Sequence, residues 1–251
     1  MIGDGKHIAI ITGAGSGIGL AIASKLAMDG AKVFLNDIDL QSLERVKVEL
    51  QRAGVPSEYI SFMSGDVASS SDVKHLFDAC LDTFGDLSLL VNNAGILQQK
   101  KFEQISVQDW DRMISVHLRG CFLGCHNAVP IFKNRGGGVI VNIASQLGQI
   151  GAADLVHYAS AKAGIIGLTK SLARELSVHK IKVNAVAPGP INTELVLGLS
   201  EEWRTAKAEQ LPIGYFGEPE DVAATVAFLA SDASRTFVGQ TLGPNSGDVM
   251  L

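Results

Sequence analysis

The chain has 251 residues, of which 47% are hydrophobic and 19% are charged, and its formal net charge is -5 at pH 7. This composition supplies enough apolar material for a large core, and we interpret residues 1–251 as a single domain because no linker, repeat or low-complexity tract divides them. The acidic balance and the scattered basic residues argue against a nucleic-acid partner, and no apolar stretch approaches the length that spans a bilayer.

Residues 1–7 lead directly into an apolar run and lack the long apolar region and cleavage site of a signal peptide. The three cysteines, Cys80, Cys121 and Cys125, form an odd and sparse set that does not suit a disulfide framework. Both observations predict a cytoplasmic protein without a membrane partner.

Short apolar runs alternate with longer helical stretches along the whole chain. The runs that we expect to be strands are residues 7–12, 32–36, 59–63, 87–91, 139–144, 181–187 and 240–242. Helical patterns lie between them, most clearly at residues 40–52, 71–84 and 218–231. Continuous apolar runs are typical of strands that are buried on both faces. The sequence therefore predicts an α/β fold, a doubly wound, seven-stranded parallel sheet with helices on both faces, in which ligands bind at the carboxyl ends of the strands.

A glycine-rich loop follows the first expected strand and precedes a helix. Its residues are Gly13, Ser16, Gly17, Ile18 and Gly19. Glycines at this place let the backbone turn tightly and approach a pyrophosphate at the helix N-terminus. The simpler alternative is a glycine-rich turn that holds no ligand, but the position between strand and helix favours phosphate binding.

The second expected strand ends at Asn36-Asp37, eighteen residues beyond Gly19. A carboxylate at this place can accept hydrogen bonds from both ribose hydroxyls of the adenosine half of NAD, and it would repel the extra phosphate of NADP. No arginine or lysine is expected near this turn to hold that phosphate, since the next residues are Ile38, Asp39 and Leu40. Asp39 is the better candidate for capping the following helix, so we predict NAD as the cofactor.

Tyr158 and Lys162 are four residues apart in a helical stretch and therefore share one face. A free phenol has a pKa near 10, and an ammonium close by, with the positive nicotinamide, would bring it toward neutrality. Ser145, thirteen residues earlier at a strand end, can hold the substrate oxygen within reach of Tyr158. Alone, the pair is usually a surface feature and the serine a strand-end hydroxyl. Their combination predicts general acid/base catalysis, and the context of Ser145 lacks the elbow of a nucleophilic serine.

These motifs stand in register along nearly the entire chain, which resembles the short-chain dehydrogenase/reductase family. The glycine spacing fits the family's T-G-x-x-x-G-x-G, and the catalytic set fits Ser145 with Tyr158-x-x-x-Lys162. Further matches are Asp66-Val67, the N-N-A-G motif that contains Asn93, Ala94 and Gly95, the turn Pro188-Gly189, and residues 217–221. The resemblance implies hydride transfer between nicotinamide and a secondary alcohol or ketone, in either direction.

The resemblance also implies roles for residues that the pattern alone does not assign. Asp66 and Val67 would contact the adenine ring, and Lys162 would hold the nicotinamide ribose. Ile191 and Thr193, which follow Pro188, would hold the carboxamide. A substrate loop would cover about residues 189–212, and its apolar side chains Leu195, Leu197, Leu199 and Trp203 could close over the ligand.

This sequence departs from the family pattern at several places. Many members carry a fourth catalytic residue, an asparagine, where this chain has His117 in Val116-His117-Leu118. We place His117 at the site, because an imidazole can donate, accept and titrate near neutrality, although it could instead only support the helix. Pro244 and Ser246 stand near the usual glycine pair, and Tyr215-Phe216 replaces an arginine before Gly217.

The helix that contains His117 also carries Cys121, Cys125 and His126, at a spacing that zinc could accept. No fourth ligand or C-x-x-C accompanies them, so we predict no metal. We expect pocket neighbours that mix amides with apolar groups and suit a polar secondary alcohol or ketone, namely Gln98, Gln99, Gln146, Leu147, Gln149, Asp154 and His157.

Two alternative functions remain beside an NAD-dependent alcohol dehydrogenase or ketone reductase. An NADPH-dependent 3-oxoacyl-thioester reductase fits the fold and the catalytic set, but Asp37 and the acidic balance disfavour it. A catalytically silent NAD-binding regulator is disfavoured by the intact catalytic set. The helix beginning at Tyr158 is dense in small residues (Ala159, Ser160, Ala161, Ala163, Gly164 and Gly167), and with the resemblance this predicts a homotetramer.

Overall fold

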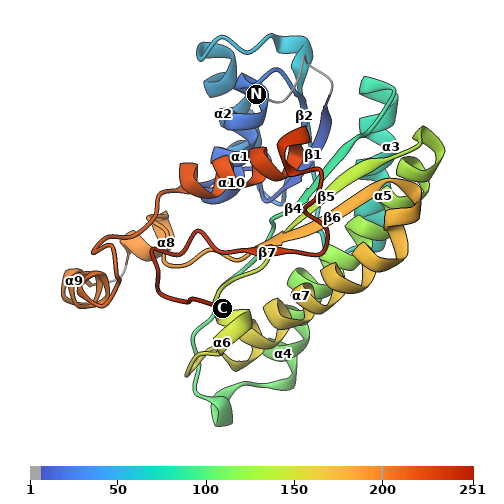
Figure 1. The fold of residues 1–251 in the computed structure, drawn as a ribbon. Coiled ribbons are helices and arrows are strands. Elements are labelled where there is room, and N and C mark those ends of the chain that lie inside the picture. The colour runs from blue at the N-terminus through green and yellow to red at the C-terminus, as the bar shows by residue number, and fades with distance from the viewer. Residues whose placement is uncertain (1–6, 199) are drawn as a thin grey trace.

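The computed structural model describes residues 7–198 and 200–251, and it contains a parallel sheet of seven strands (Figure 1). The order across the sheet is β3-β2-β1-β4-β5-β6-β7. The strands are β1 (Ile8–Thr12), β2 (Lys32–Asp37), β3 (Ile60–Ser64), β4 (Leu89–Asn92), β5 (Gly138–Ile143), β6 (Ile181–Val186) and β7 (Thr241–Leu242). The order reverses between β1 and β4, which places the ligand-binding edge of the sheet at their carboxyl ends.

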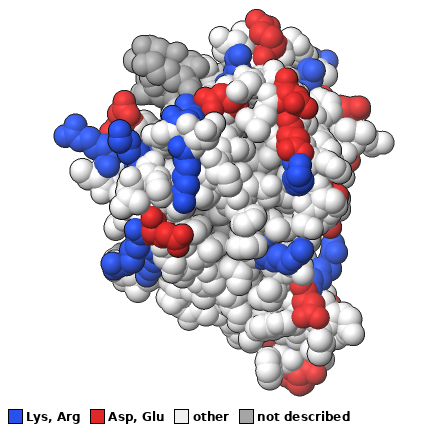
Figure 2. Space-filling view, turned by 90° about the vertical axis from the view of Figure 1, so that its right-hand side faces the viewer, with Lys and Arg blue, Asp and Glu red and all other residues white. Residues whose placement is uncertain are grey.

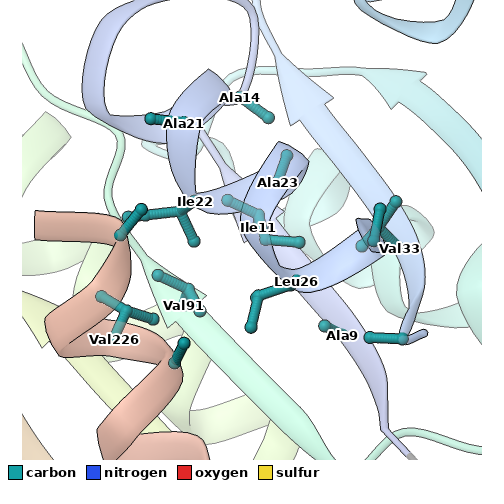
Figure 3. Close-up of a cluster of buried hydrophobic side chains, with 14 of the residues drawn as sticks. Ala9, Ile11, Ala14, Ala21, Ile22, Ala23, Leu26, Val33, Val91 and Val226 are labelled. Atoms are coloured by element: carbon teal, nitrogen blue, oxygen red, sulfur yellow. The ribbon is translucent and has the colours of Figure 1, made fainter. Parts of the chain in front are cut away.

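One face of the sheet is covered by α1 (Gly17–Met28), α2 (Leu40–Arg52) and α10 (Pro219–Ala230). Helices α1 and α10 pack against each other, and Figure 3 shows Ile22 and Leu26 of α1, Val226 of α10 and the strand residue Val91 in one apolar cluster. Helices α2 and α10 begin at residues that are typical of helix N-termini. Asp39 caps α2 by accepting from the Gln41 N–H, as the sequence predicts, and Pro219 stands in the first turn of α10.

The other face is covered by α3 (Ser70–Phe84), α5 (Gly120–Arg135) and α7 (Val156–Leu176). A second apolar core lies beneath them, with Phe34, Phe77 and Phe132 among its largest side chains. A π-helical turn, η4 (Ser115–Arg119), joins α4 (Val107–Ile114) to α5. Single π-helical turns inside longer helices are frequent at functional sites, and this one contains His117.

The remaining elements are short. Helix α6 (Leu147–Ile150) follows β5, and α8 (Glu194–Leu197) and α9 (Glu201–Glu209) lie between β6 and α10, where they project from the body in Figure 1. The 3-10 turns are η2 (Ser57–Tyr59), η3 (Phe102–Gln104), η5 (Ser177–His179) and η6 (Asp232–Ser234). Residues 192–216 are called the α8–α9 segment below, and the parallel bridge between Ile191 and Gly217 closes its base.

The predicted fold class is confirmed, and the strand boundaries differ from those expected by one or two residues. The fourth strand shows the shift, since it begins at Leu89 rather than at 87. The expectation for residues 1–6 lies outside the described residues, as do Leu199 and the side chain of Leu195.

Positive and negative side chains are interspersed on the face shown in Figure 2, which is the right-hand side of Figure 1. No large surface of one sign covers it, in agreement with the scattered charges of the sequence. None of the helices in the described part of the chain is long and apolar enough to cross a membrane.

Candidate active site

A cavity of about 520 Å³ lies at the carboxyl ends of the central strands and gathers most of the predicted site residues. Its lining includes fifteen of them, namely Gly13, Ser16, Gly17, Ile18, Gly19, Asp37, Asn93, Gly95, His117, Ser145, Tyr158, Lys162, Pro188, Ile191 and Thr193. These residues come from positions far apart in the sequence, and they belong to the end of β2, to the loops that follow strands, to the first turn of α1, or to η4 and α7.

The glycine loop forms one end of this cavity. Gly13 and Gly17 have φ angles of +64° and +52°, a left-handed conformation that glycine adopts at little cost. Ser16 is the N-cap of α1 but makes no side-chain capping hydrogen bond. The first N–H groups of α1, which no residue inside the helix can satisfy, therefore stand beside the cavity as donors for an anion. This arrangement fits a pyrophosphate.

Asp37 stands at the end of β2 beside the same loop. Its Oδ2 accepts from the Gly15 N–H at 2.9 Å, and its Oδ1 accepts from the Asp39 N–H at 3.1 Å. A side chain at position 15 would place its Cβ 2.8 Å from that Oδ2, so glycine is needed for the contact. Each carboxylate oxygen retains a free lone pair, and the pair of oxygens can still accept from two ribose hydroxyls.

Arg45 corrects one sequence inference. The residues directly after Asp37 include no basic side chain, yet Arg45 of α2 donates from a guanidinium nitrogen to the Gly15 carbonyl at 3.2 Å. Arg45 is eight residues beyond the last strand residue, Asp37, and helix α2 places its side chain beside the glycine loop. The inference that no arginine lies near the turn is therefore wrong, because it considered neighbours in sequence only.

The catalytic candidates Ser145, Tyr158 and Lys162 line the other end of the cavity. Ser145 Oγ accepts from the Leu147 N–H at 3.1 Å, which leaves its own O–H free to donate. Lys162 is 4% exposed and donates from Nζ to the Ile143 carbonyl at 2.7 Å. Its Nζ lies 5.6 Å from the centroid of the Tyr158 ring, so the two side chains share one face of α7 as the spacing predicts.

The electrostatics of this end are set by burial. Burial lowers the pKa of Lys162 from 10.5 to about 8, because an ammonium loses hydration there. Burial raises the pKa of Tyr158 above its usual value, and the Ser145 hydroxyl partly offsets that effect. The chain alone therefore does not bring the phenol toward neutrality, and the expected lowering depends on the positive charge of an oxidised nicotinamide.

His117 lies between Gly95 and Tyr158 in the wall of the cavity. Its Nε2 faces both the N–H and the carbonyl oxygen of Ile96, at 3.1 and 2.8 Å, and its Nδ1 is buried with no partner among the described residues. A side chain at position 95 would place its Cβ 2.4 Å from His117 Cε1. Burial, then the Lys162 ammonium, lower the pKa of His117 to about 3, so the expectation that it titrates near neutrality is wrong.

Three predicted cofactor residues do not line the cavity. Asp66 turns its Oδ1 to the Ala68 N–H at 2.8 Å, and Val67 packs where Gly120 would otherwise carry a side chain. Ala94 donates from its N–H to Thr12 Oγ1 at 3.1 Å. Their roles toward adenine and nicotinamide stay predictions.

The expected pocket neighbours also differ, because none of the seven lines the cavity. Gln98 instead contacts Asp109 and His157, and Gln146 contacts Asp248. The substrate end is lined by Pro190, Glu194 and Val196, which lie in the predicted substrate loop, and by Ile96 and Leu97, which sequence reasoning missed. The position of Ile96 and Leu97, one and two residues after the N-N-A-G motif, is the signal that could have found them.

A zinc site from His117, Cys121, Cys125 and His126 is not assembled. His126 is exposed and stacks on Phe122, whereas Cys121 and Cys125 are buried. Among residues 7–198 and 200–251, no three His, Cys, Asp or Glu side chains gather as metal ligands.

Comparison with known proteins finds relatives that match almost the whole chain. Residues 13–247 match the family model described as enoyl-(acyl carrier protein) reductase. A 3-oxoacyl-[acyl-carrier-protein] reductase of Staphylococcus aureus is 40% identical over 243 residues, which cover 96% of this chain and 98% of that protein. Proteins of the same name from Thermotoga maritima and Aquifex aeolicus are both 37% identical, over 98% and 96% of this chain and 99% and 96% of their own lengths.

Proposed function

Because this chain belongs to the short-chain dehydrogenase/reductase family of oxidoreductases, we propose that it transfers a hydride between NAD(H) and the secondary carbon of a 3-oxoacyl or 3-hydroxyacyl thioester. The observation that carries the proposal is the shared cavity, in which Ser145, Tyr158 and Lys162 stand opposite the glycine loop and Asp37. The cavity therefore joins a dinucleotide-binding end to a proton-transferring end.

The proposed chemistry uses each catalytic side chain in one step. When bound, the reduced nicotinamide supplies the hydride to the carbonyl carbon. Tyr158 donates its phenolic proton to the carbonyl oxygen, and Ser145 holds that oxygen through its free O–H. Lys162, fixed by the Ile143 carbonyl, keeps two N–H donors for a ribose hydroxyl and stabilises the phenolate that remains. In the reverse direction, the phenolate accepts the proton of the alcohol.

NAD is the proposed cofactor because the Asp37 carboxylate, at the end of β2 in the cavity, would accept from the hydroxyls of the adenosine ribose. A 2′-phosphate would bring a second negative charge against it, and unfavourable charge pairs of this kind cost several kcal/mol. Arg45 favours NADP, although one of its guanidinium N–H groups is held by the Gly15 carbonyl.

His117 is proposed as a positioning residue for the cavity wall. Its Nε2 contacts both polar groups of the Ile96 peptide, and Ile96 with Leu97 forms the substrate end. A neutral imidazole can satisfy either group according to its tautomer, so it can serve where the family commonly has asparagine.

The relatives favour a thioester over a small alcohol as the substrate. The three relatives described above are named for reduction of 3-oxoacyl groups on a carrier protein, and this supports the same chemical class for this chain. The apolar side chains of Ile96, Leu97 and Val196 give the cavity a surface that suits an acyl chain.

A panel of substrates with both cofactors tests the proposal. Acetoacetyl-coenzyme A, a 3-oxoacyl carrier protein, a simple cyclic ketone and a secondary alcohol are assayed by NADH or NADPH absorbance. We expect the highest kcat/KM with a thioester and NADH. A higher kcat/KM with the simple ketone or alcohol would return the substrate class to small alcohols, and a preference for NADPH would overturn the cofactor assignment.

A further inference from the structure

The last residues of the chain fold into a fixed turn against the cavity floor. The Gly189 N–H donates to the Pro244 carbonyl at 3.1 Å, and Asn245 Nδ2 donates to the Val249 carbonyl at 2.7 Å. Ser246 and Gly247 both have positive φ angles, 58° and 81°. Ser246 therefore holds a conformation that is unfavourable for a residue other than glycine, and the turn fixes the direction of Asp248 two residues later.

Asp248 lies between two side chains from different parts of the molecule. Its Oδ2 accepts from Gln146 Nε2 at 2.5 Å, and its Oδ1 pairs with Lys207 Nζ at 2.8 Å. The Asp248 side chain is 15% exposed and that of Lys207 is 25% exposed. A pair with this degree of burial is screened less by solvent than an exposed one.

The two partners of Asp248 belong to separate segments of the chain, and both segments contribute residues to the cavity. Gln146 directly follows Ser145, and its N–H donates to the Pro188 carbonyl at 3.0 Å. Lys207 belongs to α9, in the segment that is closed at its base by Ile191 and Gly217. Figure 1 shows the C-terminus ending beside α6, the helix that begins one residue after Gln146.

Few other polar contacts hold the α8–α9 segment to the body. Among the residues that the structure describes, Lys207–Asp248 is the only ion pair between this segment and the rest of the chain. Pro212 adds an apolar contact to Gly247, where a Cβ would stand 2.8 Å from the proline ring. Thr193, Glu194 and Val196 of the same segment line the cavity, so the position of the segment sets the shape of the substrate end.

We propose that Asp248 is a positioning residue that ties α9 to the end of β5, through Lys207 and Gln146, and holds the α8–α9 segment in the arrangement that binds substrate. The inference rests on the proposed hydride transfer for its kinetic consequence, but the link itself is independent of that chemistry. Breaking it lowers the fraction of molecules in the binding arrangement, and the apparent KM rises by the inverse of that fraction.

The kinetic test compares Asp248→Asn and Lys207→Met with the wild type in the reduction of acetoacetyl-coenzyme A. We expect KM to rise about five- to tenfold while kcat stays within a factor of two. Raising the salt concentration from 0.05 to 0.5 M should raise KM of the wild type but not of the variants. Lys74→Met is the matched control, because it removes an exposed ion pair with Asp78 on α3 and should leave both constants unchanged.

A charge swap tests whether the ion pair itself, rather than the packing of the two side chains, holds the α8–α9 segment. In Lys207→Asp combined with Asp248→Lys the ion pair is reversed, and the Gln146 amide can turn to present its oxygen to the new ammonium. The increase in KM should be at most half as large in the double variant as in either single variant. If the two single effects simply add, the proposed link is wrong.

A second readout does not require turnover. The chain has two tryptophans, Trp110 and Trp203, and Trp203 lies in α9 with its ring 6.3 Å from that of Phe216. In a Trp110→Phe background, Asp248→Asn should shift the Trp203 emission to longer wavelength and increase its quenching by acrylamide. Unchanged emission and quenching would overturn the link. A changed emission in a protein that reduces no thioester would leave the link standing and refute the proposed substrate.

Discussion

The imidazole of His117 stands edge-on to the phenol ring of Tyr158, with ring centroids 5.3 Å apart and an angle of 88° between the planes. The contact joins η4 to α7 in the wall of the cavity, which both residues line. Since His117 is 3% exposed and its pKa is lowered to about 3, the ring is neutral at physiological pH. It can therefore exchange hydrogen bonds with Ile96 without adding a charge beside Lys162.

The lowered pKa of His117 makes a prediction about acid stability. The unfolded chain binds a proton at this residue below pH 6.5 and the folded chain does not until about pH 3, so stability is lost as pH falls through this window. His117→Asn should remove about 2 kcal/mol of the loss in unfolding free energy between pH 6.5 and 4.5. Urea unfolding at several pH values measures it. The exposed His126→Asn is the control, and an equal slope for wild type and His117→Asn would contradict the shift.

The proposed positioning role of His117 predicts different activities for two replacements. Asparagine can still donate to the Ile96 carbonyl or accept from its N–H, whereas leucine can do neither and leaves both groups unsatisfied. An unsatisfied buried group costs about 1–3 kcal/mol of stability, so the Ile96 peptide should move toward another partner and displace the substrate end. His117→Leu should therefore lower kcat/KM by about tenfold or more, and His117→Asn by less. Equal losses would mean that the imidazole only fills space.

The fold and the chemical groups of the site could be predicted from local pattern. Buried strands gave continuous apolar runs, and helix α2 occupies residues 40–52 as expected, because Asp39 and the spacing of its apolar residues define it locally. Contacts between residues that are far apart in the sequence and meet only in the tertiary structure could not be predicted in this way. Arg45 reaching Gly15, and Asp248 joining Gln146 to Lys207, depend on how helices and the C-terminal turn pack. That residues 1–251 form one domain stays a prediction.

The predicted homotetramer can now be tied to a particular surface. Of the small residues of α7, Ala161 is buried and Gly164 packs against Leu118, whereas Ser160, Ala163 and Gly167 are exposed on one face. This face permits the close approach of another helix. Light scattering at micromolar concentration should give the mass of four chains, and Ala163→Arg should reduce that mass. A monomer mass for the wild type would rule the tetramer out.

Cofactor preference follows from Asp37. We expect kcat/KM with NADH to exceed that with NADPH at least tenfold, since like charges at the ribose cost several kcal/mol. Asp37→Ser combined with Ile38→Arg should move the preference toward NADPH, and Ile38 is exposed enough to accept the change. Arg45→Gln should leave the ratio unaltered, because its guanidinium already serves the Gly15 carbonyl. A selective loss of NADPH activity in Arg45→Gln would instead assign Arg45 to the phosphate.

Tyr158→Phe tests the proposed acid/base directly. The change keeps the ring and its contact with His117 but removes the oxygen that transfers the proton, so NADH should still bind. Loss of general acid/base catalysis typically lowers kcat by 10²–10⁴, or about 3–5 kcal/mol of barrier. Because burial raises the pKa of Tyr158, alcohol oxidation by the wild type should increase with pH as the phenol ionises, and this increase should vanish in the variant. Lys162→Ala should lower kcat and also weaken NADH binding. If Tyr158→Phe kept kcat within about threefold, the acid/base assignment would be wrong, while the fold and cofactor site would be unaffected.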